Sequence, residues 1–238
     1  MTGSAGGIGA SIVSLFLSHG AKVAALDITD STLPADDSRL DINCNVTSED
    51  SINDAVRRVL NEWTTIDVLV NCAGVMDSFE RVDEMPTATW TRCFAVNVNG
   101  PFHLMRAVLP HFLSKHQEQH KGAIVNLCST AALRGAAAGV AYTASKHALL
   151  GLSRSTAWMY AQDGVRCNAV CPGGTQTNIV QNSGVQIVPE QYGRVKPYLD
   201  CQRKIGQPDE VARAVLFLAT ADAVNGAELA VDYGWSTC

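Results

Sequence analysis

The sequence predicts an α/β fold, a doubly wound parallel sheet with helices on both faces. Apolar, β-rich runs alternate with helical patterns along the 238 residues, as expected when strands and crossover helices follow one another. A glycine-rich loop at residues 2–9 opens the first helical pattern, which is typical of such sheets. No linker, repeat or low-complexity tract divides the chain, so we expect a single domain over residues 1–238.

The first half of the chain contains two helical patterns and three strand patterns. Gly20 stops the first helix, because glycine readily adopts the backbone conformation that ends helices. Thr47 is the expected cap of the second helix, with Asp50 three residues later in the capping-box position. Residues 30–38 form a polar turn that is too short for a crossover helix. The expected elements are helix 7–19, strand 21–27, strand 40–46, a helix from 47 to about 63, and strand 66–71.

The second half of the chain adds two long helices, three strands and a final helix. Pro208 begins that final helix, because proline is favoured at the first helical position. The segment 175–205 is polar and is expected to be irregular. The expected elements are helix 87–115, strand 122–129, helix 139–161, strand 165–170, the helix from 208, and strand 228–231.

The strand that should precede the glycine loop is missing, since only Met1 stands before Thr2. In a doubly wound sheet that strand is central, and without it both neighbouring strands would bury unpaired backbone groups. We expect either that the assigned start lies too late or that the sheet is rebuilt, and we favour the first. The chain as written should then be less stable than one that carries the strand.

Composition and charge exclude several classes of protein. The net charge is −5, and no basic run is longer than Arg57-Arg58, which argues against a nucleic-acid surface. No apolar stretch approaches the ~20 residues that a membrane-spanning helix needs. No signal peptide precedes the glycine loop, so we expect a cytoplasmic protein without a membrane partner.

The cysteines and histidines do not predict a metal site. The cysteines are scattered without a Cys-x-x-Cys pair, and several lie in apolar runs, so we expect buried, reduced thiols. His111, His116 and His120 gather near the end of a helix, where a solvated helix end is favoured over metal ligation.

The glycine loop and the residue that ends the next strand predict a dinucleotide site. Gly3, Gly7 and Gly9 would allow a tight turn and a close approach of backbone N–H groups to a pyrophosphate. Asp27 is placed to accept hydrogen bonds from the adenosine ribose and would repel a 2′-phosphate. No Arg or Lys stands nearby to hold such a phosphate, so NAD is favoured over NADP.

Tyr142 and Lys146 are four residues apart on one expected helix and therefore share a face. The phenol of tyrosine normally titrates near pH ~10, and a nearby cation lowers that pKa. The pair could therefore act as a general acid or base near neutral pH. Alone the spacing is weak evidence, but Ser129 lies thirteen positions upstream at the expected end of a strand.

Together these motifs resemble the short-chain dehydrogenase/reductase family of the single-domain type, from Thr2 to the end of the chain. Residues 30–38 and 165–173 also show some likeness to 2,3-dihydro-2,3-dihydroxybenzoate dehydrogenases. The markers are Thr2-Gly-x-x-x-Gly7-Ile8-Gly9, Asp27, Asn71-Cys-Ala73-Gly74, Asn97, Ser129, Tyr142-x-x-x-Lys146, Pro172-Gly173-x-x-x-Thr177 and Val231-Asp232-Tyr-Gly234.

The resemblance implies four catalytic residues. Tyr142 would exchange a proton with the substrate hydroxyl, and Ser129 would hydrogen-bond the substrate oxygen. Lys146 would bind the nicotinamide ribose and lower the pKa of Tyr142. Asn97, with Asn99 as its rival, would hold a water that links Lys146 to solvent.

The resemblance also implies the residues that hold NAD. Asn45 stands where the family usually has Asp, but its carbonyl can still accept a bond from the adenine amine. Tyr233 replaces a glycine and would affect subunit contacts. The cofactor-binding residues are Gly3, Ser4, Gly7, Ile8, Gly9, Asp27, Asn45, Val46, Asn71, Ala73, Gly74, Tyr142, Lys146, Pro172, Gly173, Thr175 and Thr177.

The resemblance implies an NAD(H)-dependent oxidoreductase that interconverts a secondary, cyclic or apolar, alcohol and a ketone. The alternative is a family member that binds NAD without redox turnover, as a sensor or a redox-neutral biosynthetic catalyst. Segment 175–205 would form a lid, and helices 87–115 and 139–161 would pair subunits into a homodimer or homotetramer. The expected pocket residues are Val75, Met76, Thr130, Ala131, Ala136 and Gly174.

Overall fold

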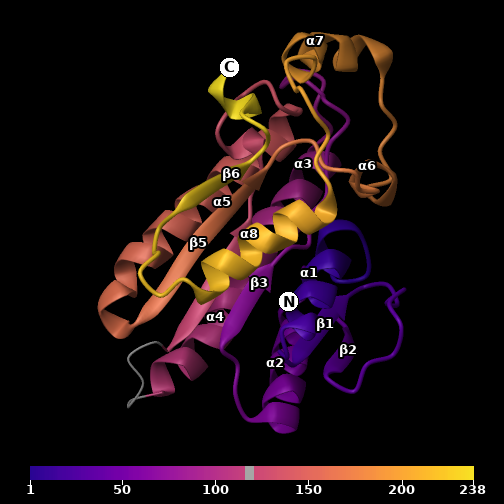
Figure 1. Ribbon diagram of the computed structural model, residues 1–238. Coiled ribbons are helices and arrows are strands. Elements are labelled where there is room, and N and C mark those ends of the chain that lie inside the picture. The colour runs from indigo at the N-terminus through magenta and orange to yellow at the C-terminus, as the bar shows by residue number, and fades with distance from the viewer. Residues whose placement is uncertain (116–120) are drawn as a thin grey trace.

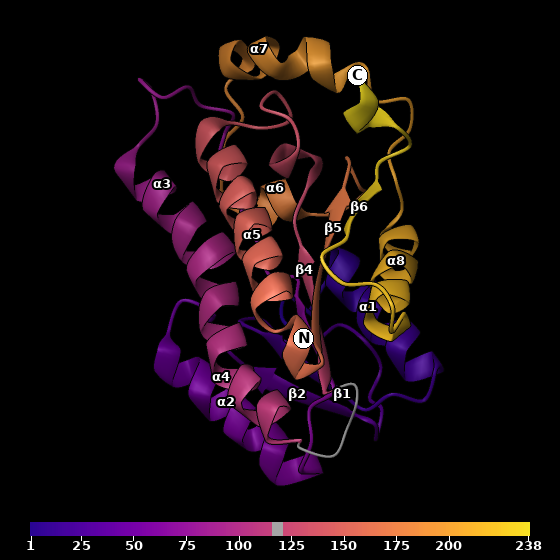
Figure 2. The ribbon, with the colours of Figure 1, turned by 90° about the vertical axis from the view of Figure 1, so that its left-hand side faces the viewer.

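The computed structural model describes residues 1–115 and 121–238, with a parallel sheet between two layers of helices (Figures 1 and 2). Within these residues the sheet has two parts. β1 (Val23–Asp27) pairs with β2 (Arg39–Asn43), and the other part has the order β3 (Val68–Asn71), β4 (Gly122–Leu127), β5 (Val165–Pro172), β6 (Glu228–Val231). Every strand pair is parallel, so the predicted Rossmann-type α/β class is confirmed.

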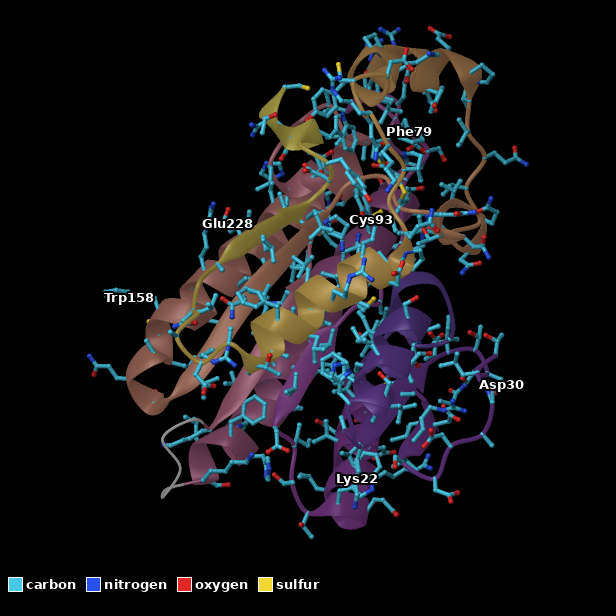
Figure 3. The ribbon with its side chains drawn as sticks, viewed as in Figure 1. Lys22, Asp30, Phe79, Cys93, Trp158 and Glu228 are labelled. Carbon is cyan, nitrogen blue, oxygen red and sulfur yellow. The ribbon has the colours of Figure 1, made fainter. Side chains whose placement is uncertain are left out.

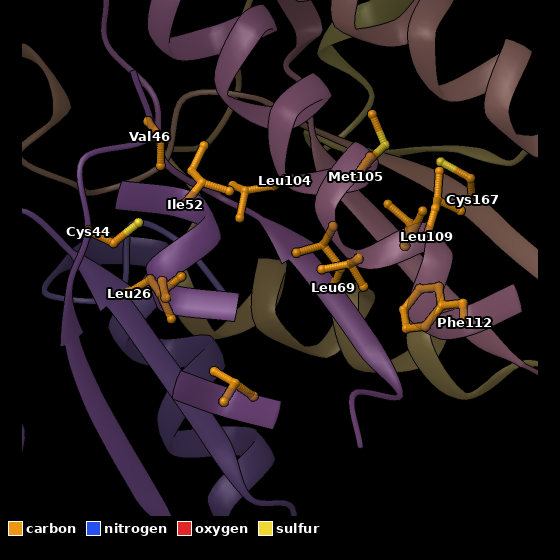
Figure 4. Packing of buried hydrophobic residues seen from close by; sticks show 14 of the residues in the cluster. Leu26, Cys44, Val46, Ile52, Leu69, Leu104, Met105, Leu109, Phe112 and Cys167 are labelled. Carbon is orange, nitrogen blue, oxygen red and sulfur yellow. The ribbon is translucent and has the colours of Figure 1, made fainter. Parts of the chain in front are cut away.

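The two helix layers cover opposite faces of the sheet (Figure 2). One layer contains α2 (Glu49–Trp63), α3 (Thr87–Phe94), α4 (Gly100–Ser114) and α5 (Val140–Met159). The other contains α1 (Gly7–Ser18) and α8 (Pro208–Thr220). Figure 4 shows the core under the first layer, where side chains such as Leu69, Leu104 and Phe112 are buried together. A second core, which includes Ile12 and Val211, joins α1 and α8 to the sheet.

Most helix ends lie where the sequence predicts them, but the cap of α2 does not. Gly20 follows α1 with a φ of +79°, and Pro208 is the first residue of α8. The cap of α2 is Ser48, whose hydroxyl accepts a hydrogen bond from Ser51 N at 3.3 Å. Thr47 is not the cap, because its N–H and hydroxyl both donate to Asn45 Oδ1.

The predicted helix 87–115 is interrupted by a π-helical turn at Ala95–Asn99, between α3 and α4. A π-turn inserts an extra residue into the helical repeat, and such turns are frequent at functional sites. This one includes Asn97, whose side chain is fully buried, whereas Asn99 is exposed. The turn therefore directs Asn97 into the protein.

The segment 175–205 is not irregular, contrary to the prediction. It contains α6 (Ile179–Asn182) and α7 (Pro189–Leu199), and α7 lies over the top of the molecule beside the C-terminus (Figure 1). Pro189 occupies the favoured first position of α7, and Lys196 pairs with Asp200 at its end, 2.6 Å apart. The sequence pattern did not predict this helix, because the segment contains a glycine and an internal proline, Pro197.

Met1 and Thr2 lie between β1 and β3, where the last residues of a central strand are expected. Met1 N donates to Ala24 O at 2.7 Å, and Met1 O accepts from Leu26 N at 2.9 Å. On the other side, Thr2 N donates to Val70 O at 3.0 Å. These two residues therefore bridge β1 and β3 in the parallel sense that a full strand would have.

Below Met1 the two parts of the sheet are separated by a slot, since no ladder joins β1 to β3 among the described residues. The slot holds a cavity of about 530 Å³ with a mainly apolar lining, which includes Phe16, Val23, Val56, Leu69 and Val108. Alternate residues of a strand turn their N–H and C=O groups to the same side, so the backbone groups of Val68 and the N–H of Ala24 face the slot, while Ala24 O is bonded to Met1 N. Buried backbone groups without partners destabilise a fold.

We predict that an apolar β-strand of about six residues, fused ahead of Met1, fills this slot and stabilises the protein. Each net ladder bond contributes ~0.5–1.5 kcal/mol, so several bonds should raise the melting temperature by on the order of 10 °C. Thermal unfolding is compared with that of a chain carrying a Gly/Ser segment of equal length. Equal melting temperatures for the two fusions would show that the slot does not accept a strand.

Candidate active site

The carboxyl ends of three parallel strands meet the glycine loop at one edge of the sheet, where α/β folds bind ligands. The loop is anchored there by Thr2, whose hydroxyl accepts hydrogen bonds from Cys72 N and Ala73 N, each at 3.2 Å. Ser4 is buried, and its N–H donates to Leu26 O at 3.4 Å. Predicted cofactor residues from three segments are thus brought together.

The loop can form only because glycines stand at its closest contacts. A Cβ at position 3 would lie 2.7 Å from Ala73 N, and one at position 9 would lie 1.7 Å from Gly3 O. Gly3 and Gly7 also have positive φ values of 67° and 52°, which other residues rarely adopt. Ile8, between two of these glycines, packs against the core under α1 and α8.

Asp27, at the end of β1, closes the far side of the loop. One carboxylate oxygen accepts from Ala5 N at 3.0 Å, and the other accepts from the N–H and hydroxyl of Thr29. Asn45 differs from its predicted state, because its Oδ1 already accepts two bonds from Thr47. Its Nδ2 is the group that remains to contact a ligand. Val46 next to it is buried against Gly100.

Tyr142, Lys146 and Ser129 come together as predicted. Tyr142 lies in the first turn of α5, and Lys146 follows one turn later. Lys146 Nζ donates to Leu127 O at 2.8 Å and lies 5.5 Å from the centre of the Tyr142 ring. Ser129, just after β4, lies beside the Tyr142 phenol, where its hydroxyl lowers the pKa of that group. The site therefore has an acid/base group, a hydroxyl partner and a cation.

Asn97 reaches this group from the π-helical turn. Its amide exchanges two hydrogen bonds of 2.9 Å with the backbone of Val75, and it also donates to Ser145 Oγ at 3.0 Å. A Cβ at Gly74 would lie 3.4 Å from Asn97 Oδ1 and 3.5 Å from Lys146 Nζ. Asn97, and not Asn99, therefore lies beside Lys146.

The pKa values correct one expectation. We expected Lys146 to lower the pKa of Tyr142, but burial raises this pKa, and the nearby Ser129 hydroxyl only partly opposes the effect. Burial also lowers the pKa of Lys146. In both cases loss of water disfavours the charged form. The raised pKa therefore keeps the phenol protonated.

The segment after β5 connects the sheet to the glycine loop. Pro172 ends β5, and Gly173 N donates to Val231 O at 3.0 Å. Thr175 Oγ1 donates back to Gly173 O at 3.1 Å. Thr177 lies against the loop, with its Cγ2 3.2 Å from where a Cβ of Gly7 would be. At the centre, Asn71 donates to Asn126 Oδ1 at 2.7 Å, so its side chain is tied into the sheet.

An apolar cluster adjoins Tyr142 and includes residues that the sequence did not single out. Trp235 is buried, its ring is 4.9 Å from that of Tyr198 in α7, and its Nε1 donates to Tyr198 O at 2.8 Å. No motif marks this pair, because only the fold brings the two together. The cluster consists of Met76, Ala131, Ala137, Ala138, Tyr142, Tyr198, Leu199 and Trp235.

The other predicted pocket residues lie outside this cluster, some buried or bonded near the site and one exposed. Thr130 is buried beside Pro172 O, Val75 is bonded to Asn97, and Gly174 O accepts from Gln202 Nε2 at 3.0 Å. Ala136 is exposed and lies outside the cluster.

The lid segment is attached to the loop that follows β3. Met76 N donates to Ser183 Oγ at 2.8 Å, and Arg92 Nη2 donates to Met76 O at 2.9 Å. Phe79 lies beneath α7, where its ring meets that of Tyr192 edge-on at 5.5 Å (Figure 3). Segment 175–205 therefore contacts the loop after β3 at two places, Ser183 and Tyr192.

No group of three or more metal-ligating side chains occurs in residues 1–115 and 121–238. His116 and His120 lie outside these ranges, and His111 Nε2 accepts from Ile66 N at 3.1 Å. All eight cysteines are free, and five of them are buried, while Cys201 and Cys238 are exposed. In the same part of the chain no helix has the length and apolar character to cross a bilayer.

Comparisons with known proteins agree with this geometry. A family model described as enoyl-(acyl carrier protein) reductase matches residues 3–236. The chain is 41% identical to the short-chain dehydrogenase/reductase olcF of Penicillium canescens, over 100% of this chain and 95% of that protein. It is 37% identical to 3beta-hydroxysteroid dehydrogenase 2 of Eggerthella lenta, over 99% of this chain and 93% of that protein.

Solved structures show the same likeness. One is the 3-ketoacyl-(acyl-carrier-protein) reductase from Brucella melitensis complexed with NADH, with a TM-score of 0.85, 27% identity, and coverage of 99% of this chain and 96% of that one. Another is ElxO with NADP bound, with a TM-score of 0.85, 25% identity, and coverage of 100% and 97%.

We predict that Gly9→Ala destroys the glycine loop, because the added methyl would overlap Gly3 O. The melting temperature should fall, and affinity for a nicotinamide dinucleotide, measured by titration calorimetry, should drop at least about tenfold, which is ~1.4 kcal/mol. Gly6→Ala is the matched control, since no described atom lies within 4 Å of its Cβ position. Equal binding by the two variants would contradict this account of the loop.

Proposed function

Because the chain belongs to the short-chain dehydrogenase/reductase family, we propose that it interconverts a secondary alcohol and a ketone with a nicotinamide cofactor. The observation that carries this proposal is the cluster of Ser129, Tyr142 and Lys146 beside a glycine loop whose close contacts require glycine. The cytoplasm is the proposed location.

The residues present fit the cofactor. The loop around Gly3 and Gly9 would present backbone N–H groups to a pyrophosphate, Asp27 would accept hydrogen bonds from the adenosine ribose, and Lys146 would reach the nicotinamide ribose. When bound, the nicotinamide supplies or accepts the hydride at C4. The protein supplies orientation and the movement of the proton.

Tyr142 moves that proton. In ketone reduction its phenol donates to the carbonyl oxygen, and Ser129 donates a hydrogen bond to the same oxygen. The raised pKa of Tyr142 keeps the phenol protonated for this direction, and Lys146 stabilises the phenolate that remains. In alcohol oxidation each step runs in reverse. Asn97 holds the backbone beside Lys146 and would position a water that exchanges the proton with solvent.

An apolar, cyclic substrate is the class that we propose. The cluster beside Tyr142 has aromatic rings from Tyr198 and Trp235 and small alanines, which suits a flat apolar ring system. A relative at 37% identity is named 3beta-hydroxysteroid dehydrogenase 2, which supports this class.

The test is direct. The purified protein is mixed with NAD or NADP and a panel of secondary alcohols that includes 3β-hydroxysteroids, while nicotinamide absorbance is followed. The proposal expects turnover with at least one apolar cyclic alcohol. Dinucleotide binding without any absorbance change across the panel would favour a family member that binds NAD without redox turnover.

We predict that Tyr142→Phe keeps the fold and cofactor binding but loses most turnover. Phe preserves the ring while removing the transferable proton, and loss of such a group typically costs ~10²–10⁴ in rate. Steady-state kinetics, with circular dichroism as the check on folding, measure this. A variant with near-wild-type kcat would remove Tyr142 from the mechanism.

We predict that wild type prefers NAD and that Asp27→Ala combined with Ile28→Arg moves the preference towards NADP. The change removes an anion and adds a partner for the 2′-phosphate at Ile28, which is 66% exposed. The ratio of kcat/KM for the two cofactors is the readout. A wild-type preference for NADP would refute this role of Asp27.

We also predict a homodimer or homotetramer. Two sets of large apolar side chains are exposed: Trp90 and Phe102 on α3 and α4, and Phe217 with Tyr233 near α8 and β6. Trp158 is 82% exposed and projects from the end of α5 (Figure 3). Light scattering measures the mass in solution, and a monomer of 25.4 kDa at micromolar concentration would be the contrary result.

A further inference from the structure

Asp77 is a buried carboxylate, only 1% exposed, to which the proposed mechanism gives no role. It lies in the loop after β3 and accepts three backbone hydrogen bonds. Oδ2 accepts from Tyr142 N at 2.8 Å, and Oδ1 accepts from Gly139 N at 3.1 Å and from Phe79 N at 3.3 Å. A buried carboxylate is unfavourable unless it is compensated in this way.

The helix that carries Tyr142 lacks a cap of its own. Gly139 occupies the N-cap position of α5 and has no side chain to accept a bond. An N-cap side chain normally accepts from the second or third N–H of its helix, and Tyr142 is the third residue of α5. Asp77 provides this acceptor from a loop 65 residues earlier in the chain. Its negative charge also suits a helix N-terminus.

Asp77 and a side chain at position 139 exclude each other. A Cβ at Gly139 would lie 2.5 Å from Asp77 Oδ1. The backbone of Gly139, with φ −73° and ψ 177°, is one that any residue can adopt. Glycine is therefore required here for space and not for conformation, and the space is taken by the Asp77 carboxylate.

The Asp77 loop is in turn fixed by the lid. Met76, the preceding residue, donates to Ser183, which follows α6, and accepts from Arg92 of α3. Phe79, two residues later, has a φ of +66° and packs against Tyr192 of α7. The neighbours of Asp77 in the chain, Met76 and Phe79, are therefore both anchored, which holds the carboxylate in place.

We propose that Asp77 is a positioning residue, a helix cap supplied by a distant loop that sets the place of Tyr142 relative to Ser129 and Lys146. This proposal rests on the proposed function, because its effect is measured through proton transfer by Tyr142. Asp77 itself need not touch the substrate.

The experiment uses Asp77→Ala, Gly139→Asp and the double variant. Asp77→Ala should lower kcat between about tenfold and ~10²-fold, since small displacements of a reacting group have effects of this size. The KM for the dinucleotide should not change. Gly139→Asp alone should also be impaired, because its Cβ displaces Asp77. In the double variant the new carboxylate takes the vacated space and can accept from Tyr142 N, so kcat should recover.

The pH profile provides a readout that a merely structural role would not move. The charge of Asp77 adds to the effect of burial in raising the pKa of Tyr142. In the pH–rate profile of alcohol oxidation, Asp77→Ala should therefore shift the acidic limb to lower pH. The double variant should restore the limb. The titratable groups that face Tyr142 are Lys146 on its own helix, Cys128 after β4, Cys93 on α3 and Asp77.

Kinetics are measured far below each melting temperature, and Asp83→Asn, whose side chain is 62% exposed, is the matched control. The control should behave as wild type. The proposal is overturned if Asp77→Ala keeps the wild-type kcat and pH profile, or if the double variant is no better than Asp77→Ala. If the wild type turns over its substrate and the variants give either of these results, only the role of Asp77 is wrong. If the wild type shows no turnover, the proposed function is wrong, and the role of Asp77 with it.

Discussion

The site depends on a buried ammonium group. Lys146 is 3% exposed, and a cation in such a place needs an acceptor. Leu127 O provides it at 2.8 Å, and this bond fixes α5 against the end of β4. Tyr142, one turn earlier on α5, is thereby placed beside Ser129. The same lack of water lowers the pKa of Lys146 and raises that of Tyr142, because burial disfavours the charged form of each group.

Other parts of the fold hold the first turns of α5 from different sides. The π-helical turn brings the amide of Asn97 to Ser145, one residue before Lys146. The loop after β3 brings the Asp77 carboxylate to the backbone of Tyr142. The geometry of the proposed proton transfer is therefore set by tertiary contacts, although Tyr142 and Lys146 lie within one helical turn.

The sequence predicted the residues whose chemistry requires a particular side chain at a particular spacing. Gly3 and Gly9 could be recognised because their close contacts admit no other residue. Other features depend on tertiary packing and left no pattern. Ser48 caps α2 because Thr47 is engaged by Asn45, α7 forms from a polar segment, and Trp235 meets Tyr198 only in the folded chain. Asp77 had no motif at all.

Transfer of isotope from the cofactor tests the central claim most directly. Reduced dinucleotide deuterated at C4 is turned over with an apolar cyclic ketone, and the alcohol product is examined by mass spectrometry and NMR. The account predicts one deuterium on the carbinol carbon and a hydroxyl proton drawn from solvent through Tyr142. A product whose carbinol hydrogen comes from water would contradict hydride transfer at this site.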